Sequence, residues 1–272
     1  MSSVVRLSRR ALTKVWGTPR TEPWFDNVNH ERIGEVWFES PADTPLLIKF
    51  LFTSESLSIQ VHPGDEYARL HHNCLGKTEM WHVLRADEGA KIAIGPRRRI
   101  TREELAAVAG KPEILDLLNW VEVRRGDTFF IPAGTIHALG GGLALCEIQQ
   151  LSDVTYRLYD YGRDRELHIA HSLDVSRLAP GNERREPIFI ESGRELLAEC
   201  QYFRTERLTV AGATFCKPNH IGIVLEGEVR ADDELFGAGD AFAVGDQGSR
   251  IESDGALIVS VTAQCEAGET AK

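Results

Sequence analysis

The sequence has few cysteines and no long run of apolar residues. Its five cysteines are widely spaced, and none stands in a C-x-x-C pair. This spacing argues against a disulfide framework and against a zinc site built on thiolates, and favours buried free thiols. Nowhere do about 18 apolar residues follow one another, as a membrane-spanning helix requires. We therefore expect no membrane span.

The sequence also lacks an excess of basic residues. Its 31 lysines and arginines stand against 41 aspartates and glutamates, which gives a formal net charge of −10. An acidic chain has no general attraction for nucleic acid or anionic membranes, although one or two local cations suffice for a small phosphorylated ligand. We therefore expect neither a nucleic-acid partner nor a membrane partner.

The N-terminal segment has no apolar run of the length that a secretory signal peptide needs. Arg6, Arg9 and Arg10 leave a transit peptide as the less favoured alternative. The expected location is the cytoplasm.

Most of the sequence consists of short runs with the apolar pattern of β-strands, bounded by turn residues. Turn spacings of about 8–12 residues indicate a sandwich, a jelly roll or a barrel. Residues 187–262 are expected to contain short strands, with glycines at the turns between them. In the N-terminal half the predicted strands are 45–52, 57–62, 80–85, 91–94, 120–124, 127–131 and 143–149.

One helical interval, at about residues 101–118, interrupts these strands. It begins with a capping box formed by Thr101 and Glu104, and its apolar residues follow helical spacing. A break at Gly110 to Pro112 suggests two short helices. The fold class is therefore all-β, with two β-barrel units and a short helical insertion in the first.

Two motifs offer residues that can bind a divalent metal. In SIQVHP, residues 58–63, Gln60 and His62 are two apart and project from the same face of a strand. In GKTEMWHVL, residues 76–84, Glu79 lies where a loop meets an apolar strand. A carboxylate buried there needs a partner.

A third motif, GDTFFIPAGTIHAL at residues 126–139, turns at Pro132 and Gly134 and delivers His137 inward. Its G-x5-P-x-G-x2-H pattern resembles the second signature motif of the cupin superfamily. We therefore expect two cupin or jelly-roll barrels, residues 1–165 and residues 166–272. The second is expected to be degenerate and free of metal, because it lacks an H-x-H or Q-x-H pair.

Two imidazoles, one carboxylate and one amide form a ligand set of nitrogen and oxygen donors. Because no thiolate is offered, a closed structural zinc site is disfavoured, and a site with an open position is the catalytic form. Zinc suits these donors, and Fe2+ and Mn2+ fit them as well.

The three motifs, together with CEIQQLSDVTYRLYDYGR, resemble in order those of the type I phosphomannose isomerases, and of their short bacterial branch in particular. Residues 15–17 (VWG) and 34–38 (GEVWF) resemble that family's N-terminal motifs, so the resemblance covers residues 15–162. It implies one zinc ion per chain. The zinc ligands that the resemblance implies are Gln60, His62, Glu79 and His137.

The resemblance also implies an aldose–ketose isomerase that interconverts mannose 6-phosphate and fructose 6-phosphate. Its intermediate is an enediolate, whose negative charge a metal or a fixed cation can stabilise. Arg157 matches the family's active-site arginine and is always charged, so we expect an electrostatic clamp and not a base. Glu147, Lys77 and Ser58 match positions of the substrate pocket. The general base stays open between Glu147, Lys77 and His137, and a metal-bound His137 suits that role poorly.

The expected partner is thus a small phosphorylated sugar, and the oligomeric state has no signal in the sequence. Gly64 and Thr18 depart from the family pattern, which usually has an acidic residue and a second glycine there. Three other functions remain open. They are an isomerase of another aldose phosphate, an iron-dependent cupin dioxygenase and a non-catalytic sugar-phosphate sensor.

The remaining histidines are expected to lie away from the metal. His82 is out of step with Glu79 on its strand, so it should face the opposite way. The tail from Ala263 to Lys272 is expected to be disordered. Histidines expected in a solvated loop or at the surface are His71, His72, His168 and His171.

Overall fold

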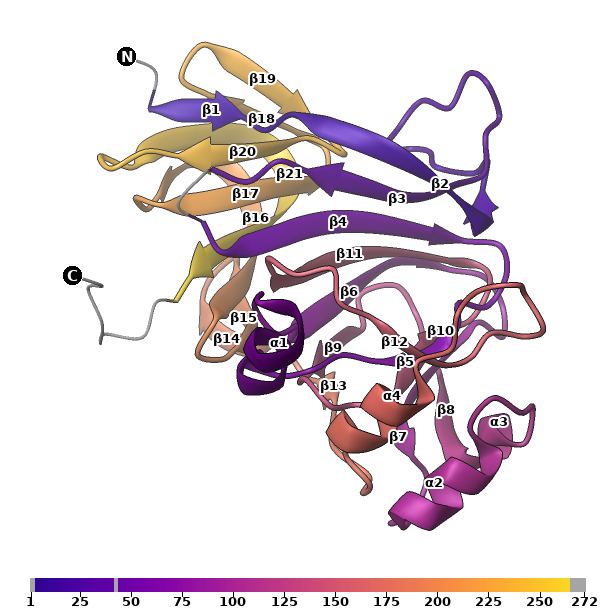
Figure 1. The fold of residues 1–272 in the computed structure, drawn as a ribbon. Coiled ribbons are helices and arrows are strands. Elements are labelled where there is room, and N and C mark those ends of the chain that lie inside the picture. Colours follow the sequence, from indigo (N-terminus) through magenta and orange to yellow (C-terminus); the bar gives the residue numbers. More distant parts are fainter. Residues whose placement is uncertain (1–2, 42–43, 265–272) are drawn as a thin grey trace.

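The structure is a computed structural model that describes residues 3–41 and 44–264. These residues form twenty-one strands and four helices. The strands make up three sheets, and the helices lie outside them (Figure 1). The prediction of an all-β fold with a short helical insertion is confirmed. No helix of the described residues has the length and apolar character that crossing a membrane requires.

A sheet of seven antiparallel strands forms the middle of the molecule. In spatial order its strands are β13 (Arg184–Arg185), β9 (Thr128–Ile131), β6 (Glu79–Ala86), β11 (Leu143–Gln150), β4 (Leu46–Thr53), β3 (Ile33–Phe38) and β2 (Arg9–Thr18). Every residue of β4 and β11 is buried, as the continuous apolar runs at these positions predict.

A second sheet has five strands and packs against one face of the first. Its strands are β12 (Tyr156–Tyr159), β5 (Ile59–Val61), β10 (His137–Leu139), β7 (Lys91–Pro96) and β8 (Leu118–Glu122). Apolar side chains of the two sheets, including Trp81, Phe129 and Ile92, form a common core. The predicted metal ligands come from these two sheets.

The third sheet has nine strands and belongs mainly to the C-terminal part of the chain. Its strands are β1 (Val4–Arg6), β20 (Ala241–Val244), β17 (His220–Glu226), β21 (Ser249–Ala263), β16 (Phe203–Cys216), β15 (Arg194–Glu199) and β14 (Ile188–Glu191), with β18 (Glu228–Ala231) paired with β21 and β19 (Glu234–Gly237) paired with β18. Residues such as Phe203 and Ile223 pack against Phe50 of the middle sheet. The middle sheet therefore has a core on each of its faces.

The expectation of short strands throughout residues 187–262 is wrong for β16 and β21, which have 14 and 15 residues. Gly212 and Gly255, expected at turns, lie inside these strands with φ of 88° and 145°. The register between the two strands shifts at Val210/Ala211. A glycine inside a strand often marks such an irregularity and does not end the strand.

The predicted helical interval forms two short helices, α2 (Arg102–Val108) and α3 (Ile114–Leu117). The Thr101 hydroxyl accepts a hydrogen bond from the Glu104 amide at 3.2 Å, and the Glu104 carboxylate accepts one from the Thr101 amide at 2.8 Å. The predicted capping box is therefore confirmed. With α4 (Ile169–Val175), these helices cover the outer face of the five-stranded sheet (Figure 1).

A fourth helix, α1 (Asp65–His72), corrects the prediction of a polar loop around His71 and His72. Both histidines lie in its last turn and are exposed. Ala68 is the buried residue of this helix, so the sequence has no apolar stripe there that would indicate a helix.

The division into residues 1–165 and residues 166–272 stays a prediction. Two short strands join sheets across that boundary: β1 pairs with β20, and β13 pairs with β9. Of the tail expected to be disordered, Ala263 is the last residue of β21, and residues 265–272 lie outside the described residues.

Candidate metal centre

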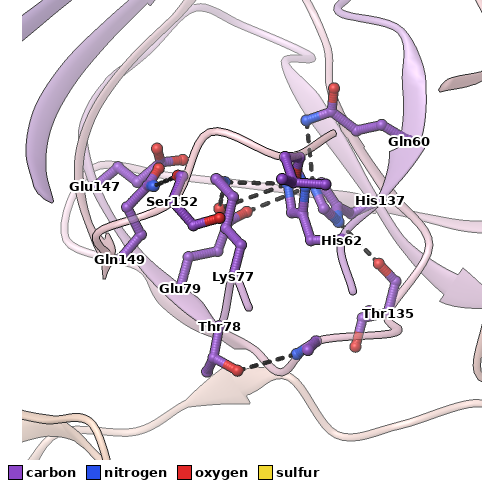
Figure 2. Close-up of polar contacts among 12 residues, drawn as sticks. Gln60, His62, Lys77, Thr78, Glu79, Thr135, His137, Glu147, Gln149 and Ser152 are labelled. Atoms are coloured by element: carbon purple, nitrogen blue, oxygen red, sulfur yellow. Dashed lines mark hydrogen bonds and ion pairs between the residues drawn. The ribbon is translucent and has the colours of Figure 1, made fainter. Parts of the chain in front are cut away.

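Three motifs that are distant in the sequence meet between the five-stranded and the seven-stranded sheet. Gln60 in β5 is the direct antiparallel neighbour of His137 in β10. His62 follows β5, and Glu79 is the first residue of β6. Ligand atoms of His62, Glu79 and His137 lie within 4.8 Å of one another, and Figure 2 shows these side chains pointing together.

Each imidazole is held by a backbone carbonyl through its Nδ1 atom. His62 Nδ1 donates to the Val154 carbonyl at 2.9 Å, and His137 Nδ1 donates to the Thr135 carbonyl at 2.8 Å. Their Nε2 atoms lie 3.7 Å and 3.4 Å from the carboxylate oxygens of Glu79. Carbonyl acceptors of this kind orient metal-binding histidines and fix their tautomer.

Gln60, the predicted fourth donor, lies beside this group. Its amide nitrogen is 3.3 Å from His137 Nε2, and its amide oxygen accepts a hydrogen bond from the Ser58 hydroxyl at 3.2 Å. A half-turn of the amide group would exchange its oxygen and nitrogen. The amide oxygen would then face the same point as the histidines.

The group is almost completely buried, and its two imidazoles are in the protonation state that metal binding requires. Burial lowers the pKa of His137 to about 4 and the pKa of His62 well below its ordinary value, so both imidazoles are neutral. Burial raises the pKa of Glu79 to about 7. One oxygen of Glu79 has no hydrogen-bond partner among the described residues. Neutral imidazole nitrogens and an unpartnered carboxylate oxygen fit a divalent cation.

Lys77 supplies the positive charge nearest to the buried carboxylate. Its ammonium group contacts the Glu79 carboxylate and lies 3.0 Å from His62 Nε2 (Figure 2). Burial alone would lower the pKa of Lys77, but the carboxylates of Glu79 and Glu147 raise it overall. Lys77 is therefore protonated.

A cavity of about 340 Å³ adjoins the metal-binding group, and its lining includes Gln60 and Lys77, which contact that group. All the residues predicted for the substrate pocket line this cavity: Ser58, Lys77, Glu147 and Arg157. The structure thus brings them together, and their roles stay predictions. The other lining residues are Lys14, Trp16, Glu35, Lys49, Leu51, Leu57, Asp153, Thr155, Arg165 and His168.

Glu147 is a buried carboxylate on β11 with fixed partners. The indole nitrogen of Trp81 donates to one oxygen at 2.9 Å, and Lys49 Nζ lies 3.5 Å from the other. Burial raises the pKa of Glu147, but Lys77 and Lys49 outweigh that effect and lower it overall. Glu147 is therefore ionised and faces the cavity.

Arg157 lies on β12, opposite Gln60 of β5. Its Nε atom is buried and has no hydrogen-bond partner among the described residues. Burial, together with the neighbouring Arg165, lowers the pKa of Arg157. A guanidinium stays charged in a protein, so this group brings a positive charge to the cavity.

The sequence prediction missed Lys49 and misplaced two histidines. Lys49 interrupts the apolar run of β4, and a lysine in such a strand signals a buried ion pair. His168, expected at the surface, lines the cavity. Its Nδ1 atom accepts a hydrogen bond from the Arg157 amide at 3.3 Å. His171 is partly buried and stacks on Tyr156, with ring centroids 4.9 Å apart.

His82 faces away from the metal centre, as its position relative to Glu79 predicts. It is buried, and its Nδ1 atom lies 2.9 Å from the Thr128 hydroxyl. Burial lowers the pKa of His82 to about 4. The folded protein therefore keeps His82 neutral at pH values at which an unfolded histidine, with a pKa of about 6.5, is protonated.

Replacing His82 by Gln is expected to flatten the loss of stability in acid. Between about pH 6.5 and pH 4 the unfolded chain binds a proton at His82 and the folded chain does not, so stability falls as pH falls. His82 accounts for about 3 kcal/mol of that loss. Urea unfolding at pH 7 and pH 4.5 measures it in both proteins. If the free energy of unfolding fell by the same amount in both proteins, the lowered pKa of His82 would be contradicted.

No family model matches the chain. The mannose-6-phosphate isomerase ManA of Bacillus subtilis (strain 168) is 40% identical over 200 residues, which are 68% of this chain and 63% of that protein. A mannose-6-phosphate isomerase of Streptococcus mutans is 46% identical over 137 residues, 48% of this chain and 43% of that protein. The chain belongs to the mannose-6-phosphate isomerase family. Its matches span less than two thirds of the length of either relative.

Solved structures extend this similarity over nearly the whole chain. A crystal structure of the mannose 6-phosphate isomerase from Bacillus subtilis is 27% identical and has a TM-score of 0.85. The match covers 95% of this chain and 99% of that one. A zinc-bound mannose 6-phosphate isomerase, 15% identical with a TM-score of 0.78 over 97% of this chain, shares the fold.

Proposed function

We propose that the chain is a zinc-dependent mannose-6-phosphate isomerase. The observation that carries the proposal is the buried group of His62, Glu79 and His137 beside a cavity lined by cationic side chains. The names of its relatives support the same reaction. The substrate would be mannose 6-phosphate and the product fructose 6-phosphate, or the reverse.

Zinc is the metal that these donors suit, and the zinc-bound relative supports that choice. We assign His62, Glu79 and His137 as ligands, with Gln60 as the fourth. Zinc in this position supplies Lewis-acid polarisation of the sugar oxygens. Four protein donors would fill a tetrahedral set, so the substrate would bind at a fifth position, which catalytic zinc can accept.

Of the three candidate bases, the environment favours Glu147. The lone pair of His137 Nε2 faces the metal position, and Lys77 is protonated. Glu147 is ionised, and its carboxylate lies in the cavity wall. In this proposal Glu147 takes the proton from C2 of the aldose and returns it to C1, while the proton of the C2 hydroxyl passes to the C1 oxygen. Lys77 and Arg157 stabilise the negative charge that develops on the sugar oxygens.

Removing the metal should abolish the reaction, and adding zinc should restore it. Fructose 6-phosphate formation from mannose 6-phosphate is measured before chelation, after chelation and after zinc is added back. We expect activity to fall to background with the chelator and to return with zinc, because the site without metal would lack the Lewis acid that polarises the sugar oxygens. A folded, zinc-loaded sample without activity would contradict the proposal.

Further measurements on the same protein separate the alternative functions. Bound iron and oxygen consumption would indicate a dioxygenase, and binding of the sugar phosphate without turnover would indicate a sensor. Turnover of another aldose phosphate alone would change the substrate and leave the metal centre in place.

The division into two units is part of this proposal. Among the described residues, one group of His, Cys, Asp and Glu side chains can hold a metal, and it lies in the predicted first unit. Residues 166–272 would then form the unit without metal. A cytoplasmic location stays a prediction.

A further inference from the structure

The segment that joins β12 to α4 forms part of the cavity wall through Arg165 and His168. It leaves the sheet after Tyr159 and returns beside Arg157, where the His168 amide donates to the Arg157 carbonyl at 2.8 Å. The Arg157 amide in turn donates to His168 Nδ1. The loop is therefore closed at its base, and its side chains are held at the cavity.

Asp160 fixes the position of Arg165 inside this loop. Its carboxylate is 2% exposed and accepts hydrogen bonds from Arg165 Nε and Nη2, each at 2.6 Å. Arg163 Nη1 lies 3.5 Å from the same carboxylate. The two hydrogen bonds to Asp160 use two of the five N–H groups of the Arg165 guanidinium, so three remain for a ligand.

Two of the three lysines of the cavity are paired with carboxylates that line the same cavity, and the third, Lys77, contacts Glu79 of the metal-binding group. Lys14 lies 3.3 Å from Glu35, and Lys49 lies 3.5 Å from Glu147. A phosphate dianion placed at these lysines would lie next to two carboxylates. Like charges at such short range are unfavourable, so this part of the cavity is a poor phosphate site.

The arginines offer a different environment. Asp160, the partner of Arg165, does not line the cavity, and Asp153, which does, forms no ion pair with either arginine among the described residues. Arg157 makes no ion pair within the described ranges, and its Nε atom is buried without a partner. Arg165 also lies close enough to Arg157 to lower its pKa. Two guanidinium groups that repel each other at one cavity wall are stabilised by anionic groups of a ligand.

We propose that Arg165, positioned by Asp160, binds the phosphate group of the sugar phosphate at the wall that it shares with Arg157. This inference rests on the proposed function. The phosphate is attached at the carbon farthest from the reacting carbons, and Arg165 lies on a different element from the metal ligands. Its contact with the phosphate is the same in ground state and transition state, so it contributes to KM and not to kcat.

The variant Arg165→Gln tests this assignment in the zinc-loaded full chain. We expect KM for mannose 6-phosphate to rise roughly tenfold or more and kcat to stay within about threefold. The inhibition constant of inorganic phosphate should rise in proportion to KM. Arg165→Lys keeps the charge and loses the fork, so it should give an intermediate KM. Zinc content should not change.

Arg98→Gln is the matched control, because Arg98 forms a similar two-nitrogen contact with Glu104 on the exposed surface and does not line the cavity. It should leave KM unchanged. Asp160→Asn removes the charge that orients Arg165 and should raise KM in the same direction, with kcat retained.

The outcomes separate this inference from the proposed function. If the wild-type protein turns over mannose 6-phosphate and Arg165→Gln leaves KM and phosphate inhibition unchanged, the assignment of Arg165 is wrong. Equal losses in kcat and kcat/KM would also overturn it. If the wild-type protein shows no turnover, the proposed function fails. Calorimetric binding of inorganic phosphate to wild type, Arg165→Gln and Arg165→Lys then still tests the arginine.

Discussion

His137→Ala is expected to weaken zinc binding by more than about a hundredfold and to remove isomerase activity. The variant deletes a donor from β10 whose Nε2 atom lies 3.4 Å from Glu79. It also leaves the Thr135 carbonyl without its imidazole partner. His62, Glu79 and Gln60 remain, so the site keeps only one of its two imidazole donors. Metal content after dialysis and fructose 6-phosphate formation measure the two effects.

His82→Gln serves as the matched control for this experiment. His82 is also a buried histidine, on the strand that carries Glu79, but its side chain contacts Thr128. At neutral pH this variant should keep both zinc and activity. A His137→Ala protein that stays fully active with no metal bound would falsify the proposed site.

The strands around the metal centre were predictable because their residues carry strong local patterns. The apolar run at 45–52 forms β4 at Leu46–Thr53, and the run at 143–149 forms β11 at Leu143–Gln150. The spacing of Gln60 and His62 predicted a shared face, and both side chains lie at the metal centre. Patterns of period two are read from neighbouring residues alone, so they need no knowledge of the rest of the fold.

The parts of the site that escaped prediction depend on contacts between distant segments. His168 reaches the cavity because a loop of the chain closes on Arg157, and nothing in the local sequence indicates that closure. The pairing of Arg165 with Asp160 arises within the same loop. Lys49 differs, because a lysine within an apolar strand carries a local signal of a buried partner.

The C-terminal sheet shows the limit of glycine as a turn signal. Gly212 and Gly255 lie within the long strands β16 and β21, where positive φ values accompany a shift of register. At Gly239, between β19 and β20, a glycine does mark a turn, with φ of 88°. A glycine permits either structure, and pairing with the neighbouring strand decides between them.

Arg157→Ala is expected to lower kcat by roughly a hundredfold to a thousandfold and to leave zinc binding intact. The guanidinium carries a fixed positive charge at the cavity, and none of its described contacts is with the side chain of a predicted ligand. Its loss removes a cation that would face the negative charge of the enediolate and leaves the metal donors in place. Steady-state kinetics and metal analysis on the same preparation measure the two effects.

Arg157→Lys is the matched variant, because a lysine keeps the charge without the planar fork and should recover part of kcat. The pattern differs from that expected for Arg165→Gln, which changes KM and leaves kcat nearly constant. Loss of zinc in Arg157→Ala would assign the arginine a structural role at the metal centre. A rise in KM alone would place it with Arg165 at the phosphate. A fall in kcat with zinc retained separates the two arginines, one acting on the reacting end of the sugar and the other on its phosphate.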